Sequence, residues 1–320
     1  MDTLVSIVVA VYNAEDCLSR CLDSLRSQTY KNIEVICVND ASTDNSQLII
    51  NAYAKKDNRI RSIIHDVNMN AGGAMNDGIK AAKGEYVCIV DNDDWLEKTT
   101  IEELIKASDN CSIDIVACDW LDYRSEDEIK QNTNLTDSSD WFENNRYALL
   151  NGFRLLGCLI RKSIFEENNL FFPEKVFYED NAIANCILFY AHSIKPLHKG
   201  LYYYYFSEGS VTRSGSIKKY EDRVYTTDLF LENLEKRGFV DDRTRELIEY
   251  RYLRLLYSTI YRLTFFSGNG GSRIAKMVAM RMADKMPNQY IHELCGSFEY
   301  NFKHPMRYYW ISRIRNYCKK

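Results

Sequence analysis

Four consecutive polar residues, Asp91-Asn92-Asp93-Asp94, directly follow an apolar run and offer carboxylates for metal or phosphate chemistry. In extended backbone, residues two apart point the same way, about 6.5–7 Å from each other, so Asp91 and Asp93 can share one face while Asn92 and Asp94 turn elsewhere. Paired carboxylates suit Mg²⁺ or Mn²⁺ rather than zinc, and these ions commonly take further ligands from substrate phosphates. The alternative is a solvated cap of the following helix, a role that suits Asp94.

A second acidic pair, Glu179-Asp180, has residue types that suit proton transfer. Like-charge repulsion raises the pKa of a carboxylate that lies beside another, which makes it a better general base. The alternative is an exposed helix N-terminus stabilised by the helix dipole. Composition alone favours this second interpretation.

Strands alternate with helices over roughly the first 120 residues, a pattern typical of a right-handed βαβ sheet. Short, β-branched apolar runs predict strands buried on both faces, and the segments between them have helical spacing. The predicted strands are 5–11, 34–38, 60–64, 86–90 and 113–118, and the predicted helices are 15–28, 45–55, 71–82 and 99–107.

Polar residues follow three of these strands, at the edge where such sheets bind ligands. Tyr12-Asn13 follows the first strand, Asp40 the second, and Asp91 with Asp93 the fourth. Asn and Asp also favour ordinary turns, but three strands that deliver polar groups to one edge favour a binding site. The turn after the first strand has no glycine and the chain has no P-loop sequence, so this edge needs a cation to hold a diphosphate.

The remainder of the chain is less regular. A polar stretch predicts a surface excursion, and the aromatic-rich segment after it predicts a small sheet and a helix beside the ligand edge. Three later segments have helical spacing. In chain order these segments are 124–140, 141–204, 218–236, 242–266 and 272–286.

Charge is distributed unevenly along the 320 residues, whose net charge is −4. Residues 251–320 contain 13 Lys and Arg against 3 Asp and Glu, a charge of +10, which leaves −14 for residues 1–250. The tail 298–320 mixes basic and aromatic residues and can form a basic amphipathic helix on an anionic membrane. The alternatives are a solvated helical face packed on the body, or a nucleic-acid contact.

The cysteines and the N-terminus indicate the cellular compartment of the protein. Ten cysteines without a C-x-x-C pair are typical of a reducing cytosol rather than of a disulfide framework or a zinc site. The Met-Asp-Thr start lacks the basic region of a signal peptide. We therefore expect a cytoplasmic protein, held at the inner face of the cell membrane by peripheral contact through the basic tail.

An ordered set of motifs across residues 3–215 resembles the family 2 glycosyltransferases. The matching segments are 5–13 (VSIVVAVYN), 24–30 (SLRSQTY), 34–46 (EVICVNDASTDNS), 70–78 (NAGGAMNDG), 82–94 (AKGEYVCIVDNDD), 172–181 (FPEKVFYEDN) and 201–212 (LYYYYFSEGSVT). The resemblance implies an α/β fold of the GT-A type, with a Rossmann-like nucleotide-binding sheet and a C-terminal helical extension. The implied domains are 1–215, divided into a nucleotide-binding half (1–120) and an acceptor half (121–215), and a basic helical extension (216–320).

The resemblance also implies roles for individual residues. Asp93 corresponds to the metal ligand for Mn²⁺ or Mg²⁺, Asp180 to the general base, with Glu179 beside it in the catalytic pair. Trp95 is a candidate for stacking on the acceptor sugar, with a core position as the equal alternative. The implied nucleotide-binding residues are Ala10, Tyr12, Asp40, Asn68, Asp91 and Asn92.

The sequence departs from the family pattern at three positions. Ala10 replaces a proline, which loosens the turn without removing the expected backbone contact. Met75 and Tyr205 replace arginines, which leaves charge neutralisation at the diphosphate to the metal or to Arg213.

The resemblance implies an inverting transfer of one sugar from a UDP-sugar to a hydroxyl of a glycan acceptor. A lipid-linked oligosaccharide is the expected acceptor, in capsule or other cell-surface polysaccharide synthesis. One alternative is a sugar-1-phosphate nucleotidyltransferase, although 12–16 lacks the Gly-rich basic loop it needs. The other is a non-enzymatic scaffold that binds nucleic acid through the tail; we expect no nucleic acid as partner. The oligomeric state stays open, with 242–286 as a candidate dimer surface.

Overall fold

The computed structural model describes residues 3–138, 140–206 and 216–266, together with Ile274, Met277, Val278 and Arg281. The chain divides into two compact units, Met1–Ser210 and Val211–Lys320. The domain boundary expected at 215, and the division of the first domain at 120, stay predictions.

Strands of the first unit form one nine-stranded sheet within the described residues, in the order β3-β2-β1-β4-β8-β6-β9-β5 with β7 paired to β6. β1, β2, β3 and β4 are parallel, and β8 joins them antiparallel to both β4 and β6. The strands are β1 Val5–Val11, β2 Ile33–Asn39, β3 Ile60–Ile64, β4 Tyr86–Asp91, β5 Trp95–Leu96, β6 Ile115–Ser125, β7 Glu128–Asn132, β8 Leu159–Arg161 and β9 Ile194–Tyr205.

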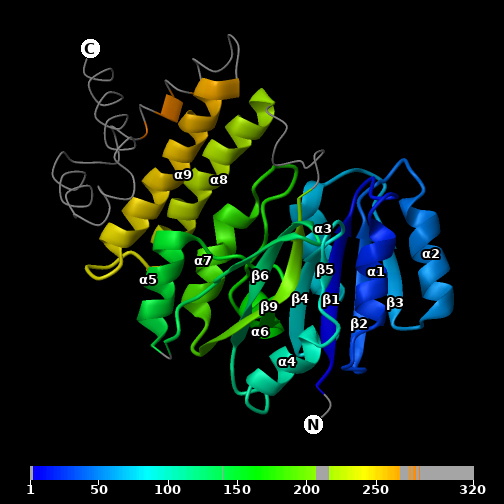
Figure 1. Ribbon diagram of the computed structural model, residues 1–320. Coiled ribbons are helices and arrows are strands. Elements are labelled where there is room, and N and C mark those ends of the chain that lie inside the picture. The colour runs from blue at the N-terminus through cyan, green and yellow to red at the C-terminus, as the bar shows by residue number, and fades with distance from the viewer. Residues whose placement is uncertain are drawn as a thin grey trace. The chain divides into compact units, whose positions relative to one another are not determined.

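Helices cover both faces of this sheet (Figure 1). Ile7 and Val9 of β1 share a buried cluster with apolar residues of α1, α2 and α4. Val8 points to the opposite face, where α3 approaches so closely that a Cβ on Gly78 would lie 2.3 Å from Val8. The helices of this unit are α1 Leu18–Arg26, α2 Ser46–Lys56, α3 Asn70–Ala81, α4 Thr100–Ala107, α5 Trp141–Asn151, α6 Lys162–Glu167 and α7 Asp180–Tyr190.

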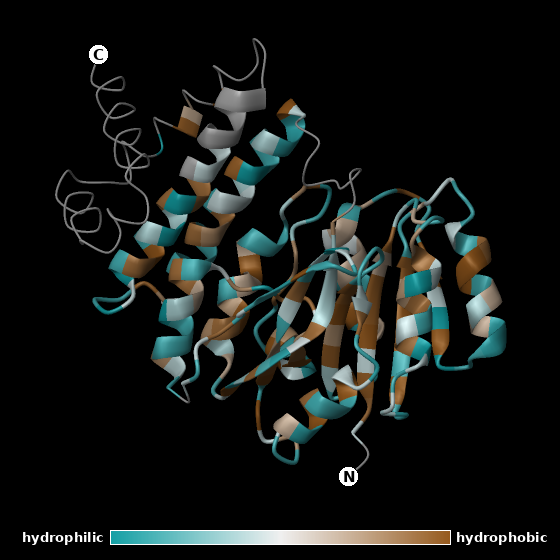
Figure 2. Ribbon diagram, in the orientation of Figure 1, coloured by the Kyte–Doolittle hydropathy of each residue, from teal (hydrophilic) through white to brown (hydrophobic). Residues whose placement is uncertain are grey.

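Apolar residues concentrate in the central strands, as Figure 2 shows, because both faces of β1 and β4 are covered by helices. This arrangement confirms the predicted alternation of strands and helices and the burial of these strands. The first helix begins at Leu18 rather than at 15, because the backbone of residues 13–15 is held in a turn by Ser42, Ser46 and Asp44.

One expectation for the middle of the chain is wrong, and another needs one addition. The polar stretch 124–140 contains an exposed strand, β7, whose charged residues hide the alternation that marks a strand. The small separate sheet expected in the next segment is the wrong expectation. No separate small sheet forms from the described part of 141–204. Instead β8 and β9 join the main sheet, and β9 pairs parallel with β6.

The second unit contains two described helices, α8 Ile217–Lys236 and α9 Arg245–Phe266, close to the predicted 218–236 and 242–266. Ser216 caps α8 by accepting from the Lys219 N–H, and Tyr252 of α9 donates to Asp228 of α8 at 2.8 Å. The predicted helix 272–286 and the basic tail 298–320 lie outside the described residues, apart from the four positions named above.

Candidate active site

Three carboxylates gather at the carboxyl end of β4. Asp91, Asp93 and Asp94 each offer an oxygen, and these oxygens lie within 4.8 Å of one another. A set of carboxylate oxygens is what Mg²⁺ and Mn²⁺ prefer, so the donor set fits a hard divalent cation. The expectation that Asp94 turns away and caps the next helix is wrong, since α4 begins at Thr100 with Thr99 at its N-cap position.

Asp94 is fully buried and ties the acidic segment to β9. The Tyr202 hydroxyl donates to Asp94 Oδ2 at 2.5 Å, and the Tyr205 N–H donates to Oδ1 at 2.8 Å. The same hydroxyl accepts from the Asp91 N–H at 3.2 Å. These bonds fix the backbone that carries Asp91 and Asp93.

The second acidic pair lies near the first. Burial, then repulsion from Asp93 and a smaller contribution from Asp180, raises the pKa of Asp91 to about 7 against the opposing effect of Arg154. Burial, then Asp180, raises the pKa of Glu179 to about 8, with a contribution from Asp91. Carboxylates influence one another in this way only at short range. Asp91 therefore interacts electrostatically with Glu179 and Asp180, although the pair also stands at the start of α7, as the alternative interpretation expected.

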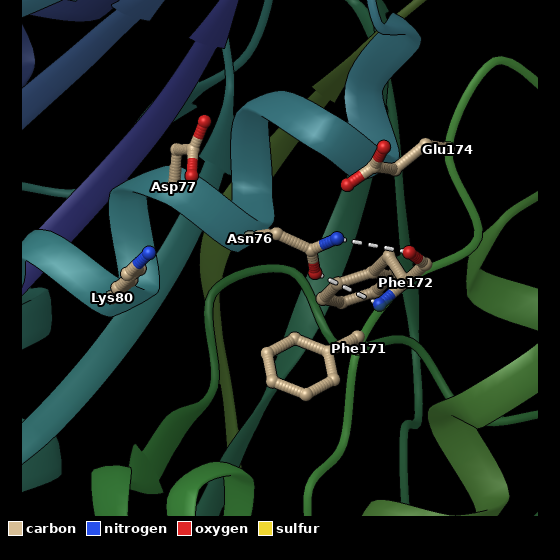
Figure 3. Close-up of a pocket in the computed structure, with 6 residues that line it drawn as sticks. All are labelled: Asn76, Asp77, Lys80, Phe171, Phe172 and Glu174. Atoms are coloured by element: carbon tan, nitrogen blue, oxygen red, sulfur yellow. Dashed lines mark hydrogen bonds between the residues drawn. The ribbon is translucent and has the colours of Figure 1, made fainter.

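The segment that carries the acidic pair is fastened to α3. The Asn76 side chain exchanges two 2.9 Å hydrogen bonds with the backbone of Phe172 (Figure 3). Lys175 N–H donates to Met69 O at 2.8 Å, and a Cβ on Gly72 would lie 2.2 Å from the Pro173 carbonyl oxygen. Only glycine lets the helix approach this closely. Beside these contacts lies an open hollow of about 420 Å³ lined by Asn76, Asp77, Lys80, Phe171, Phe172 and Glu174.

Burial of these carboxylates, together with their mutual repulsion, makes the stability of the metal-free protein depend on pH. Asp91 and Glu179 hold their protons more tightly in the folded chain, because their pKa values are raised there. The folded state then binds more protons than the unfolded state, so stability falls as the pH rises from about 4 to about 8.

Asp91→Asn removes one of these charges. It breaks no side-chain hydrogen bond to another described residue. In EDTA at pH 8 we expect the melting temperature to rise by about 5 °C, and much less at pH 5. Differential scanning calorimetry at both pH values, with the exposed Asp127→Asn as control, measures this. An equal change at both pH values would show that the charge is not the cause.

Residues predicted to bind the nucleotide lie around the ends of β1, β2 and β4. Asp40 is buried after β2, and its N–H donates to Val11 O at 2.8 Å, beside the half-exposed Tyr12. Asn68 donates to the Asp40 carbonyl at 3.1 Å, and Asn92 donates to the Ala10 carbonyl at 2.8 Å. All six predicted residues thus belong to one connected edge, and their contact with a nucleotide stays a prediction.

Two arginines that the sequence interpretation did not consider lie beside the carboxylates. The Arg20 guanidinium lies 4.2 Å from the Trp95 ring and 4.1 Å from the Tyr205 ring, and donates to the Asp93 carbonyl oxygen at 2.7 Å. Tyr205 therefore stands where the family has an arginine and stacks on another one. Met75, at the other altered position, is buried.

Arg154 is the second of these cations. Its guanidinium lies 4.2 Å from the Tyr204 ring and 4.9 Å from the Trp120 ring, and it lowers the pKa of Asp91. No local pattern marks Arg20 or Arg154, since a lone arginine in a helix or loop is usually solvated. Arg213, which the sequence suggested as the compensating cation, lies outside the described residues.

Trp95 is held by other protein side chains. Tyr203 stacks on it at 5.1 Å between ring centroids, Tyr123 meets it edge-on at 4.8 Å, and Arg20 lies over its ring. These contacts favour the structural alternative for Trp95, and its contact with an acceptor stays a prediction. No described helix has the length and apolar character needed to cross a membrane.

Comparison with known proteins identifies the family. The family model described as Glycosyl transferase family 2 matches residues 6–168. EpsH of Bacillus subtilis (strain 168) is 32% identical over 286 residues, which is 84% of this chain and 79% of EpsH. The glycosyltransferase GlyG of Streptococcus pneumoniae is 32% identical over 67% of this chain and 74% of its own.

Solved structures show the same fold. S. aureus TarS 1–349 in complex with UDP-GlcNAc superposes with a TM-score of 0.61 at 22% identity, over 80% of each chain. The mannosyltransferase PcManGT of Pyrobaculum calidifontis, in complex with GDP-Man and Mn²⁺, superposes with a TM-score of 0.56 at 15% identity, over 99% of this chain and 87% of its own. The predicted GT-A fold with a helical C-terminal region is confirmed. Together these matches show that the chain is an enzyme that belongs to glycosyltransferase family 2.

Proposed function

We propose that this enzyme is an inverting, metal-assisted transferase that moves one sugar from a UDP-sugar to a hydroxyl of a lipid-linked glycan in cell-surface polysaccharide synthesis. One observation carries this proposal: Asp91, which belongs to the carboxylate cluster after β4, interacts electrostatically with both Glu179 and Asp180 at the start of α7. The donor class is supported by TarS, which holds UDP-GlcNAc.

The chain's own groups divide the chemistry between two sides of the sugar. On the donor side, Asp40 offers carboxylate oxygens to the base, and the end of β1 at Ala10 and Tyr12 borders the same edge. The carboxylates of Asp91 and Asp93 would hold Mn²⁺ or Mg²⁺, which neutralises the charge that develops on the leaving diphosphate. Arg20 and Arg154 add fixed positive charge beside these carboxylates.

On the acceptor side, Asp180 is the proton acceptor. It is exposed at the first turn of α7, so an acceptor hydroxyl can approach it, and its carboxylate takes the proton as the hydroxyl oxygen attacks the sugar. Attack from the side opposite the leaving diphosphate inverts the anomeric centre. The raised pKa of Glu179 keeps a proton on that neighbour near neutral pH, which limits the repulsion around Asp180.

Thermal unfolding with a panel of nucleotide sugars tests the proposal. A bound donor stabilises the folded chain by mass action, so a UDP-sugar with Mn²⁺ should raise the melting temperature where GDP-sugars do not. The selected donor is then assayed for UDP release with a lipid-linked glycan acceptor. Absence of any nucleotide-dependent shift with Mn²⁺ would defeat the proposal. The membrane contact of the tail 298–320 is also proposed, and flotation with anionic liposomes checks it.

A further inference from the structure

His65, directly after β3, lies between two carboxylates. Its Nδ1 is 2.8 Å from Asp40 Oδ1, and its Nε2 is 3.1 Å from Asp77 Oδ2 on α3. An ionised carboxylate only accepts hydrogen bonds, so both contacts are satisfied when each ring nitrogen carries a proton. The ring is largely buried, and the His65 N–H donates to Asn39 O at 2.9 Å, directly before Asp40.

One carboxylate oxygen of Asp40 accepts hydrogen bonds from described residues, and the other accepts none from them. Its Oδ1 accepts from His65 and from the Met69 N–H, both at 2.8 Å. Its Oδ2 is buried and has no hydrogen-bond partner among the described residues, and the side chain is 3% exposed. A buried carboxylate oxygen without a donor costs free energy, so this oxygen is prepared for a donor that arrives from outside the chain.

We infer that His65 is a positioning residue that fixes Asp40 so that Oδ2 accepts the N–H of the nucleotide base. This inference rests on the proposed donor class. Asp77, which borders the hollow in Figure 3, holds the far nitrogen of the ring and prevents it from turning. Without His65, the Asp40 carboxylate keeps a single backbone donor on Oδ1 and can rotate about its last bond.

Base selectivity is the consequence that separates positioning from a general structural role. Uracil carries a proton on its N3 that Asp40 can accept, whereas the N3 of cytosine is itself an acceptor and meets the carboxylate unfavourably. A fixed carboxylate therefore favours UDP over CDP. A mobile carboxylate loses part of this preference, because it can turn away from cytosine as easily as from uracil.

The test measures UDP and CDP affinities by titration calorimetry with Mn²⁺. For His65→Ala we expect UDP affinity to fall about tenfold while CDP affinity changes less than about twofold. Asp77→Asn keeps the shape of the neighbour and should show a smaller loss in the same direction. The exposed His192→Ala is the matched control and should behave as the wild type.

Several results would overturn the inference. His65→Ala could keep the wild-type UDP preference, or lose UDP and CDP affinity by the same factor, which indicates a structural role. A wild-type protein that binds UDP and CDP equally also contradicts it, because Asp40 then does not distinguish the N3–H of uracil from the N3 of cytosine. A wild-type protein that binds no uridine nucleotide defeats the proposed function itself. If His65→Ala does not fold, an unchanged preference in Asp77→Asn decides against the inference.

Discussion

Asp180→Asn is expected to lower the rate of sugar transfer about 10²–10⁴-fold while UDP-sugar affinity stays within about twofold. The amide has the shape of the carboxylate but cannot take a proton from the acceptor hydroxyl. Asp180 is exposed at the start of α7 and offers no oxygen to the carboxylate cluster after β4, so metal and donor binding should survive. Steady-state UDP release with a saturating acceptor gives the rate, and calorimetry gives the affinity.

Glu174→Gln is the matched control for this variant. Glu174 is an exposed carboxylate of the same segment, at the hollow beside α3, and its loss should change neither quantity. Asp180→Glu is a second comparison, since it keeps the base and moves it by one methylene. If Asp180→Asn transfers sugar at the wild-type rate, another group is the base. If the donor affinity falls as steeply as the rate, Asp180 belongs to the donor site instead.

Local pattern was sufficient to predict the first half of the sheet. The strands 5–11 and 60–64 have the predicted bounds. The strand 5–11 is buried along nearly its whole length, and such a parallel strand needs a continuous apolar run. No local sequence pattern indicates which strands pair when they are far apart in the chain. β9 joins β6 through contacts between residues far apart in the chain, and the tyrosines 202–205 gave no indication of that partner.

Site residues that follow strand ends could be predicted, whereas site residues placed by contacts between distant segments could not. The carboxylates follow strand ends, so parallel topology alone places Asp40, Asp91 and Asp93 at one edge. Arg20 and His65 depend on which side chains meet across that edge. Arg20 is on a helix whose charged residues normally face water, and its contact with Tyr205 joins segments from opposite ends of the first unit.

Asp93→Ala is expected to remove most of the metal dependence of donor binding. Metal and UDP-sugar each strengthen the binding of the other when one cation contacts both, and such coupling amounts to about 5–150-fold. In wild-type protein the dissociation constant of the UDP-sugar should therefore be at least about tenfold lower in Mn²⁺ than in EDTA. The variant should show nearly equal constants in the two buffers, at the EDTA value of the wild type.

The structure makes this a test of the carboxylate rather than of the loop. Arg20 donates to the backbone carbonyl of Asp93, and Asp94 is bound to Tyr202 and Tyr205, so the segment keeps its anchors when the Asp93 side chain is removed. Asp127→Ala, in the exposed turn between β6 and β7, controls for loss of one negative charge. A variant at Asp93 that keeps the wild-type ratio would place the cation elsewhere. One that binds the donor more weakly in EDTA as well would show that Asp93 contacts the donor without a metal.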